Sequence, residues 1–283
     1  MVKRLRDREE AAMKIMSHDN VIKLIDVKED KDFRYWILER CLGTVRDYIN
    51  GDEKYEGHMP TEVEALMQMA NGLIYIHSKN IVHRDIKPGN ILIAESSDPT
   101  LKFVLKISDF ACSKPMAPTG KHSVSTGPRG TRAYYAPEYL RLEDSTITEE
   151  ETKHTREDKS IDIFSLGCLF FTYIVKNGSS IHPFATPGKP FNLEKADDSN
   201  DGDVIENIRK NKKYISENGI PREHYAFEMI NGMTDALPEH RWFLEKNRHG
   251  KNSVLHVLEM KLQREEAKKF KWDGLVTHLE KLG

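Results

Sequence analysis

The first part of the chain alternates short apolar runs with polar turns. Residues 21–25 and 34–38 are rich in β-branched and aromatic side chains, and we expect each run to form a strand. Two further apolar runs, residues 91–93 and 103–107, flank the polar segment 94–102, which predicts two strands joined by a long loop. The pattern therefore predicts a small amount of β structure, all of it before Asp109.

Helical periodicity starts at Thr61. Glu64 completes a capping box with this threonine, and apolar residues then recur at helical spacing up to His77, which we interpret as a packed helix residue rather than a ligand or catalyst. From Ser160 onward helical patterns dominate, and the uncharged stretch 163–175 is too short to cross a bilayer, so it predicts a buried helix. Few strands followed by many helices predict an α+β fold.

The end of the chain has a different character. Between residues 257 and 282 apolar residues recur among lysines and glutamates, which predicts a solvated pair of amphipathic helices with His278 at the surface. Residues 197–203 resemble a calcium loop, but Ile208 occupies the position of its bidentate glutamate, so we interpret them as a solvated acidic insertion.

Composition narrows the class of protein. A chain of 283 residues can form one large domain or two lobes, and a net charge of −2 gives no general reason to expect nucleic-acid binding. The three cysteines, Cys41, Cys112 and Cys168, have neither disulfide nor metal-site spacing, which favours a reducing compartment. The charged N-terminus does not resemble a signal peptide. We therefore expect a cytoplasmic chain with no membrane segment and no bound nucleic acid.

Three polar motifs follow one another in the middle of the chain. They are residues 83–90 (HRDIKPGN), Asp109-Phe110 and Ala136-Pro137-Glu138. Their order and spacing resemble the catalytic loop, the metal-binding Asp-Phe-Gly segment and the Ala-Pro-Glu segment of protein kinases.

The chemistry of phosphoryl transfer explains these residue types, because it needs positioning and charge neutralisation more than covalent help. Asp85 is the expected base for the substrate hydroxyl, and Lys87 the expected contact to the transferred phosphate, in the serine/threonine pattern. Asn90 and Asp109 offer hard oxygen ligands to Mg²⁺. Arg84 is expected to bind a phosphate on the activation segment.

The resemblance also implies an ATP site. Glu39 to Cys41 resemble the hinge whose backbone holds adenine, and Leu92 belongs to the same site. Leu38 before the hinge resembles the gatekeeper; plain core packing is the alternative, and both can be true of this residue. Lys3 matches the lysine that pairs with ATP phosphates, and Glu9 matches its partner on the following helix.

A narrower resemblance is to the cytosolic kinase of inositol-requiring enzyme, the sensor kinase-nuclease of the unfolded protein response. Residues 81–114, 120–125, 162–168 and 182–184 carry it, within an overall span of about residues 1–260. It implies a buried pair between Glu138 and Arg241, bracing of the catalytic loop by Asp162, and hydrogen bonds from Thr131 to Asp85 and Lys87. It also implies autophosphorylation at Ser123, Ser125 and Thr126, for which an ordinary polar loop is the alternative.

The chain departs from the kinase pattern in four places. No Gly-x-Gly-x-x-Gly loop precedes Lys3, and only five residues separate Lys3 from Glu9. Ala111 replaces the glycine after Asp109-Phe110, and alanine disfavours a positive φ, so we expect a stiffer switch with the metal ligand retained. Only residues 263–283 stand where the family has its ribonuclease extension, too few for a nuclease core.

These observations predict a two-lobed protein kinase fold with a truncated N-lobe. We expect a partial N-lobe in residues 1–38, a C-lobe with the hinge in 39–262, and a helical tail in 263–283. The expected function is Mg²⁺- and ATP-dependent phosphorylation of serine and threonine in protein substrates. Self-association would allow autophosphorylation, and a longer sensor would place the chain on the cytosolic face of the endoplasmic reticulum. The alternatives are a pseudokinase scaffold and, by analogy alone, a nucleotide-gated ribonuclease.

Overall fold

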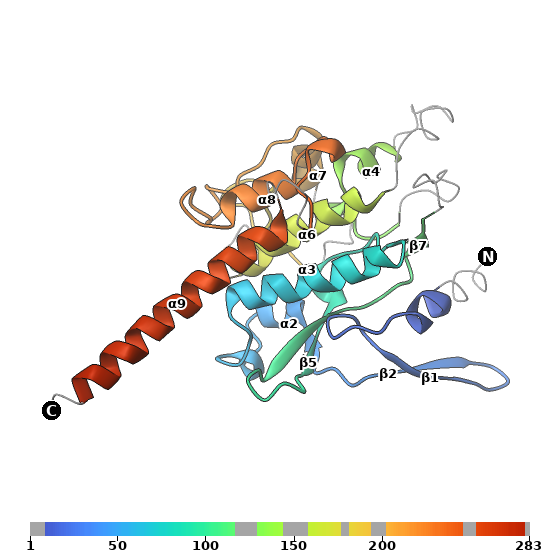
Figure 1. The fold of residues 1–283 in the computed structure, drawn as a ribbon. Helices are drawn as coiled ribbons and strands as arrows, with labels where there is room; N and C mark the ends of the chain where they lie inside the picture. The colour runs from blue at the N-terminus through green and yellow to red at the C-terminus, as the bar shows by residue number, and fades with distance from the viewer. Residues whose placement is uncertain are drawn as a thin grey trace.

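The structure, a computed structural model, describes residues 9–116, 129–143, 158–176, 181–193, 202–245 and 253–280, with side chains up to residue 268. A small N-terminal part and a larger helical part are distinct in Figure 1. The small part consists of helical residues 9–14 and an antiparallel ribbon of β1 (Leu24–Glu29) and β2 (Arg34–Leu38). The predicted α+β fold with a small N-lobe and a helical C-lobe is confirmed.

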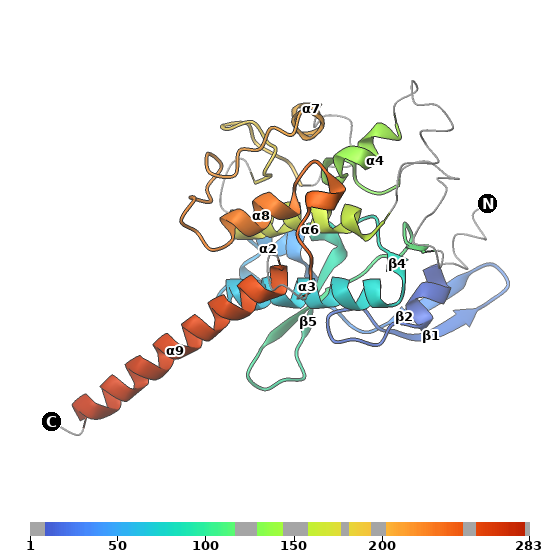
Figure 2. The ribbon, with the colours of Figure 1, turned by 45° about the horizontal axis from the view of Figure 1, so that its top comes forward.

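The C-lobe combines short strands with most of the helices. An antiparallel sheet has the strand order β3 (Gly43–Thr44), β5 (Ile91–Glu95) and β6 (Phe103–Ile107), and β4 (Ile81–Val82) pairs with β7 (Lys114–Pro115). The helices are α2 (Val45–Ile49), α3 (Glu62–Ser78), α4 (Pro137–Arg141), α6 (Lys159–Ile174), α7 (Gly202–Arg209), α8 (Phe227–Met233) and α9 (Val254–Glu280). Figure 2 shows α3 between the α6 and α8 pair and the β5–β6 hairpin.

Helix α3 forms as the sequence predicts, because its first turn is capped and one face is apolar. The Glu64 N–H donates to Thr61 Oγ1 at 3.4 Å, and the Thr61 N–H donates to the Glu64 carboxylate at 2.8 Å. Leu66, Leu73 and Ile76 are fully buried on the apolar face. The predicted buried helix in residues 163–175 is also confirmed, since Phe164, Phe170 and Phe171 of α6 have no exposed surface.

The strand predicted at residues 21–25 is wrong in its first half, because β1 begins only at Leu24. Val21 makes a parallel bridge to Ile107 of β6, and the Ile22 N–H donates to the Ile107 carbonyl at 2.9 Å. Both side chains are 1% exposed. The segment before β1 therefore attaches the small lobe to the sheet of the large lobe.

The predicted helix pair at the end of the chain is also wrong. Residues 254–280 form one continuous helix, α9, which packs beside α3 at its start and then extends away from the body (Figure 1). The predicted boundary at residue 263 falls inside this helix. Apolar spacing is the same for one long helix and for two short ones, and no glycine or proline breaks the pattern before Gly274. The side chain of His278 lies outside the described residues.

Candidate active site

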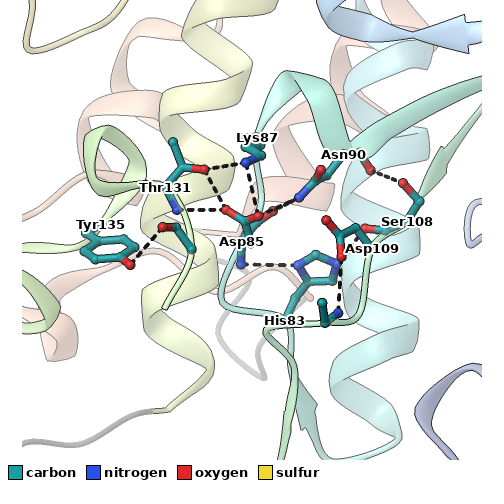
Figure 3. Close-up of polar contacts among 10 residues, drawn as sticks. His83, Asp85, Lys87, Asn90, Ser108, Asp109, Thr131 and Tyr135 are labelled. Carbon is teal, nitrogen blue, oxygen red and sulfur yellow. Dashed lines mark hydrogen bonds and ion pairs between the residues drawn. The ribbon is translucent and has the colours of Figure 1, made fainter. Parts of the chain in front are cut away.

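Asp85 is the centre of the site, and both of its carboxylate oxygens are held (Figure 3). Oδ1 accepts hydrogen bonds from the Thr131 backbone N–H and hydroxyl, each at 2.9 Å. Oδ2 accepts from Asn90 Nδ2 at 2.9 Å and lies 3.3 Å from Lys87 Nζ. The side chain is 6% exposed, so these partners fix the orientation of a largely buried carboxylate.

Lys87 and Asn90 complete this network from the same loop. Lys87 Nζ donates to Thr131 Oγ1 at 2.5 Å, which confirms the predicted contacts of Thr131 with both Asp85 and Lys87. Asn90 Nδ2 also donates to the Asp85 carbonyl at 2.8 Å. Because its Nδ2 donates to Asp85, the amide oxygen of Asn90 is the atom that can bind a cation.

A fully buried carboxylate, Asp162 of α6, holds the backbone of the loop. It accepts hydrogen bonds from the N–H groups of His83 and Arg84, each at 2.8 Å, which confirms the predicted bracing role. His77 Nε2 lies 2.8 Å from the same carboxylate. Burial alone would raise the pKa of Asp162, but the hydrogen bond from His77 and nearby positive charge keep this pKa below its usual value. His77 is thus packed as predicted, and it also carries a contact that helical spacing could not reveal.

His83 and Ser108 join the catalytic loop to the Asp109 segment. His83 Nε2 bonds to the Ser108 carbonyl at 3.0 Å, while the Asp85 N–H donates to His83 Nδ1 at 3.3 Å. The Ser108 hydroxyl and N–H both donate to the Asn90 carbonyl, at 3.0 and 2.9 Å. Neither residue was assigned a role from the sequence, although His83 is the first residue of the motif 83–90 and Ser108 directly precedes Asp109. Their contacts hold Asp109 beside Asn90 (Figure 3).

Asp109 is exposed and adopts a left-handed backbone conformation, with φ of 64°. The Ala111 N–H donates to Asp109 Oδ1 at 3.2 Å. Ala111 itself has no positive φ, so the alanine is not strained in this conformation. Phe110 is buried against the His83 ring, with ring centroids 5.2 Å apart.

Glu9 faces this site from helical residues 9–14. Burial, and then the negative charge of Asp109, raise the pKa of the Glu9 carboxyl to about 7. Lys3 lies outside the described residues, so its predicted pairing with Glu9 stays a prediction.

The hinge residues, 39–41, directly follow the end of β2. Leu38 is 38% exposed, so the alternative of plain core packing is wrong. The Glu39 carboxylate accepts from the Lys23 N–H at 2.8 Å and lies 3.2 Å from Lys106 Nζ. The Leu42 N–H donates to the Ile93 carbonyl at 2.7 Å, which places Cys41 close to Leu92 and β5.

Of two further predicted arginine contacts, the pair of Arg241 with Glu138 is confirmed, and the phosphate contact of Arg84 stays a prediction. Arg241 forms a bidentate pair with Glu138, with Nη1–Oε1 and Nη2–Oε2 distances of 2.6 and 2.7 Å, as predicted. Arg84 Nε donates to the Cys112 carbonyl at 2.6 Å. Ser123, Ser125 and Thr126, the predicted phosphorylation sites, lie outside the described residues.

The donor set suits a magnesium ion. Mg²⁺ keeps several waters and binds one or two carboxylates together with substrate phosphates. The Asp109 carboxylate and the Asn90 amide oxygen meet that requirement. Among the described residues there is no cluster of three or more His, Cys, Asp and Glu side chains for a metal held by protein alone.

Comparison with known proteins identifies the family. The family model for the protein kinase domain matches residues 3–250. The chain belongs to the protein kinase family. Protein kinases use ATP and a divalent metal ion and act on protein substrates.

Several curated kinases are similar to this domain. A human serine/threonine-protein kinase/endoribonuclease, IRE2, is 37% identical over 171 residues, covering 59% of the chain and 17% of that protein. A Caenorhabditis elegans protein of the same description, ire-1, is 35% identical over 172 residues, 59% of the chain and 16% of that protein. Calcium-dependent protein kinase 5 of Plasmodium berghei is 30% identical over 294 residues, which cover 99% of the chain and 45% of that kinase.

The chain therefore spans less than half the length of these relatives. Within the described ranges, no helix is both long and apolar enough to cross a membrane.

Proposed function

We propose that this kinase domain transfers the γ-phosphate of ATP to serine and threonine hydroxyls of proteins, with Mg²⁺ as the metal. The observation that carries the proposal is the closed network of Asp85, Lys87, Asn90 and Thr131. Each carboxylate oxygen of Asp85 is oriented by hydrogen bonds, and the Lys87 ammonium lies 3.3 Å from Oδ2.

Asp85 would accept the proton of the substrate hydroxyl. Hydrogen bonds from Thr131 and Asn90 fix the orientation of its carboxylate. Lys87, which bridges Asp85 and Thr131, would neutralise charge on the transferred phosphate. Preorganisation of this kind lowers the barrier, since these groups need not reorient during the reaction.

The nucleotide site would combine hinge and phosphate contacts. The Glu39 carbonyl and the Cys41 N–H would bind the adenine edge, with Leu38 and Leu92 against the ring. Asn90 and Asp109 would hold the metal, and Lys3 with Glu9 would complete the phosphate contacts. Bound Mg²⁺ supplies positive charge where negative charge develops on the phosphate oxygens.

The regulatory part of the proposal follows the relatives named as kinase/endoribonucleases. We propose that two copies associate and phosphorylate Ser123, Ser125 or Thr126, in unfolded protein response signalling at the cytosolic face of the endoplasmic reticulum. Phosphate on the activation segment would bind Arg84 through charge-assisted hydrogen bonds.

The Asp85→Asn variant tests the proposed chemistry. We expect it to lose phosphate transfer to a generic protein substrate by at least about a hundredfold, because it loses the base and its charge. Asp98→Asn, in an exposed loop, is the matched control and should keep wild-type activity. Equal transfer by wild type and Asp85→Asn would overturn the assignment of the base.

A scaffold without turnover is the second candidate, and Glu9 favours it. With a pKa of about 7, Glu9 is largely neutral at slightly acid pH and would pair only weakly with a lysine. This candidate holds ATP too weakly for turnover, so it predicts neither phosphate transfer nor a thermal shift with Mg²⁺-ATP for the wild-type protein. Measurable wild-type transfer that disappears in Asp85→Asn would exclude it.

A further inference from the structure

A small hollow opens directly beside Lys87. It has a volume of about 20 Å³ and is lined by Arg46, Lys87, Pro88, Gly89, Thr131, Tyr134 and Leu193. The wall therefore comes from α2, the catalytic loop, the segment before α4 and the loop before α7. Lys87 and Thr131 belong to the network around Asp85, so the hollow borders the place where a substrate hydroxyl would react.

The charged side chains that line this hollow, among the described residues, are all positive. Its described lining includes two cations, Arg46 and Lys87, and no carboxylate. Lys87 is paired with Asp85, whereas no carboxylate of the described residues lies within ion-pair distance of the Arg46 guanidinium. The neighbouring Asp47 cannot serve, because its carboxylate caps α2 by accepting from the Thr44 N–H at 2.7 Å.

The guanidinium of Arg46 lies over Gly89. A Cβ atom added at Gly89 would lie 3.7 Å from Arg46 Nη1, an ordinary contact distance. Because residue 89 has no side chain, the arginine can approach the catalytic loop closely and still remain half-buried. A half-buried guanidinium at the rim of a substrate site is well placed to bind an anion, since solvent screens it less than a fully exposed group.

We propose that the half-buried Arg46 guanidinium at the rim of this hollow selects protein substrates with an anionic side chain, a carboxylate or a phosphate, within a few residues of the phosphorylated serine or threonine. The hollow itself has room for little more than one water molecule, so the anion would bind at its rim. The inference rests on the proposed kinase function and deepens it. The acceptor hydroxyl lies at Asp85 and Lys87, and an extended peptide advances about 3.3 Å per residue, so near neighbours of the acceptor reach Arg46. Arg46 thus acts as a specificity-determining residue.

The test measures binding and turnover separately. The full chain is titrated, without nucleotide, with fluorescent serine peptides that carry aspartate, phosphoserine, alanine or arginine at each position near the acceptor. The same peptides then serve as substrates with Mg²⁺-ATP. We expect an aspartate or phosphoserine near the acceptor to raise affinity and kcat/KM at least about fivefold over alanine, and arginine to lower both.

Two variants test whether the preference for anionic peptides arises from Arg46 at this hollow. Arg46→Ala should reduce the preference for anionic peptides to near parity with alanine peptides. Gly89→Glu supplies a carboxylate within the chain next to Arg46, and it should remove the same preference without deleting the arginine. Gly89 has no positive φ, so the backbone tolerates a side chain there. Arg264→Ala, an exposed position on α9, is the control for loss of one arginine.

The outcomes separate this inference from the proposed function. If the protein binds anionic peptides preferentially, both variants remove this preference and no phosphate is transferred, the role of Arg46 is supported and the kinase proposal is overturned. If phosphate transfer occurs and both transfer and binding are equal for all peptides, the proposed selection by Arg46 is overturned and the kinase proposal stands. A preference for phosphoserine alone identifies phosphate as the ligand, and a preference unchanged in Arg46→Ala overturns the assignment.

Discussion

Two carboxyl groups, those of Glu9 and Asp109, lie close enough to affect each other at the proposed phosphate end of the site. Burial first, and the charge of Asp109 second, raise the pKa of Glu9 from 4.5 to about 7. The folded state thus binds a proton at Glu9 that the unfolded chain has already released at the same pH. By linkage, Glu9 makes the fold less stable as pH rises between these two values.

The Glu9→Gln variant should remove this pH dependence. We expect the wild type to lose free energy of unfolding relative to Glu9→Gln as pH rises from 4.5 to about 7, with a constant difference above that range. Denaturant unfolding without nucleotide and with EDTA measures the difference. Glu217→Gln, at an exposed position, is the control. Parallel pH profiles of wild type and Glu9→Gln would contradict the raised pKa.

Asp162 shows how one buried residue supports several backbone groups. Its carboxylate bonds to two N–H groups of the catalytic loop and to His77 of α3, so three separate segments meet at one side chain. Buried N–H groups need such partners, because leaving one unsatisfied costs about 1–3 kcal/mol. The orientation of Asp85 thus depends on a residue of α6 far from it in the chain.

At the scale of elements, the contact between α3 and the segment before β1 sets the attachment of the small lobe. Asn20 Nδ2 donates to the Leu105 carbonyl at 3.0 Å, and the Ile107 N–H donates to the Asn20 carbonyl at 2.9 Å. Gly72 of α3 lies against the same carbonyl: a Cβ atom at position 72 would be 2.5 Å from Asn20 O. This close approach requires glycine in the middle of a helix.

The Gly72→Ala variant tests the close approach, because helix propensity and packing predict opposite signs. Propensity alone predicts that alanine stabilises α3 by about 1 kcal/mol. We expect instead a loss of about 1–3 kcal/mol in the free energy of unfolding, since the methyl group has no room beside Asn20.

Gly202→Ala is the matched control, because nothing lies within 4 Å of the added Cβ at the start of α7. Urea denaturation of both variants gives the comparison. A Gly72→Ala protein more stable than wild type would show that α3 and the Asn20 segment do not approach so closely.

At the scale of the whole molecule, the proposed nucleotide site joins the two lobes. Its residues come from helical residues 9–14, the hinge after β2, the catalytic loop and the Asp109 segment. Ligand that binds only the folded state stabilises it by mass action, by about 2.7 kcal/mol at a hundred times the dissociation constant. For a domain of this size that corresponds to a rise in Tm of roughly 5 °C.

The Asp109→Asn variant separates metal-dependent from metal-independent stabilisation. We expect Mg²⁺-ATP to raise the Tm of the wild type more than ATP with EDTA does, and this difference to disappear in Asp109→Asn, because an amide is a weaker ligand for Mg²⁺ than a carboxylate. Differential scanning fluorimetry measures each shift, with exposed Asp32→Asn as the control. A metal effect that persists in Asp109→Asn would place the metal elsewhere.

The sequence by itself determined the elements and residues whose signals are local. Strand β2, the β5–β6 hairpin and the buried helix α6 follow from periodicity over a few residues, and the start of α3 follows from its capping box. The contacts of Thr131 and Asp162 and the Glu138–Arg241 pair were implied by the resemblance to the kinase family, and the structure contains all three.

Only the tertiary structure decided features that depend on which distant segments meet. Val21 and Ile22 pack on β6 instead of starting β1, and His77 reaches Asp162 across 85 positions of sequence. The raised pKa of Glu9 and the position of the Arg46 guanidinium over Gly89 depend on neighbours from other elements. The residue type determines whether burial or a charge interaction is favourable. It does not determine which distant residue provides the contact, because burial is non-directional and charge interactions act through space. The packing of the whole chain decides that.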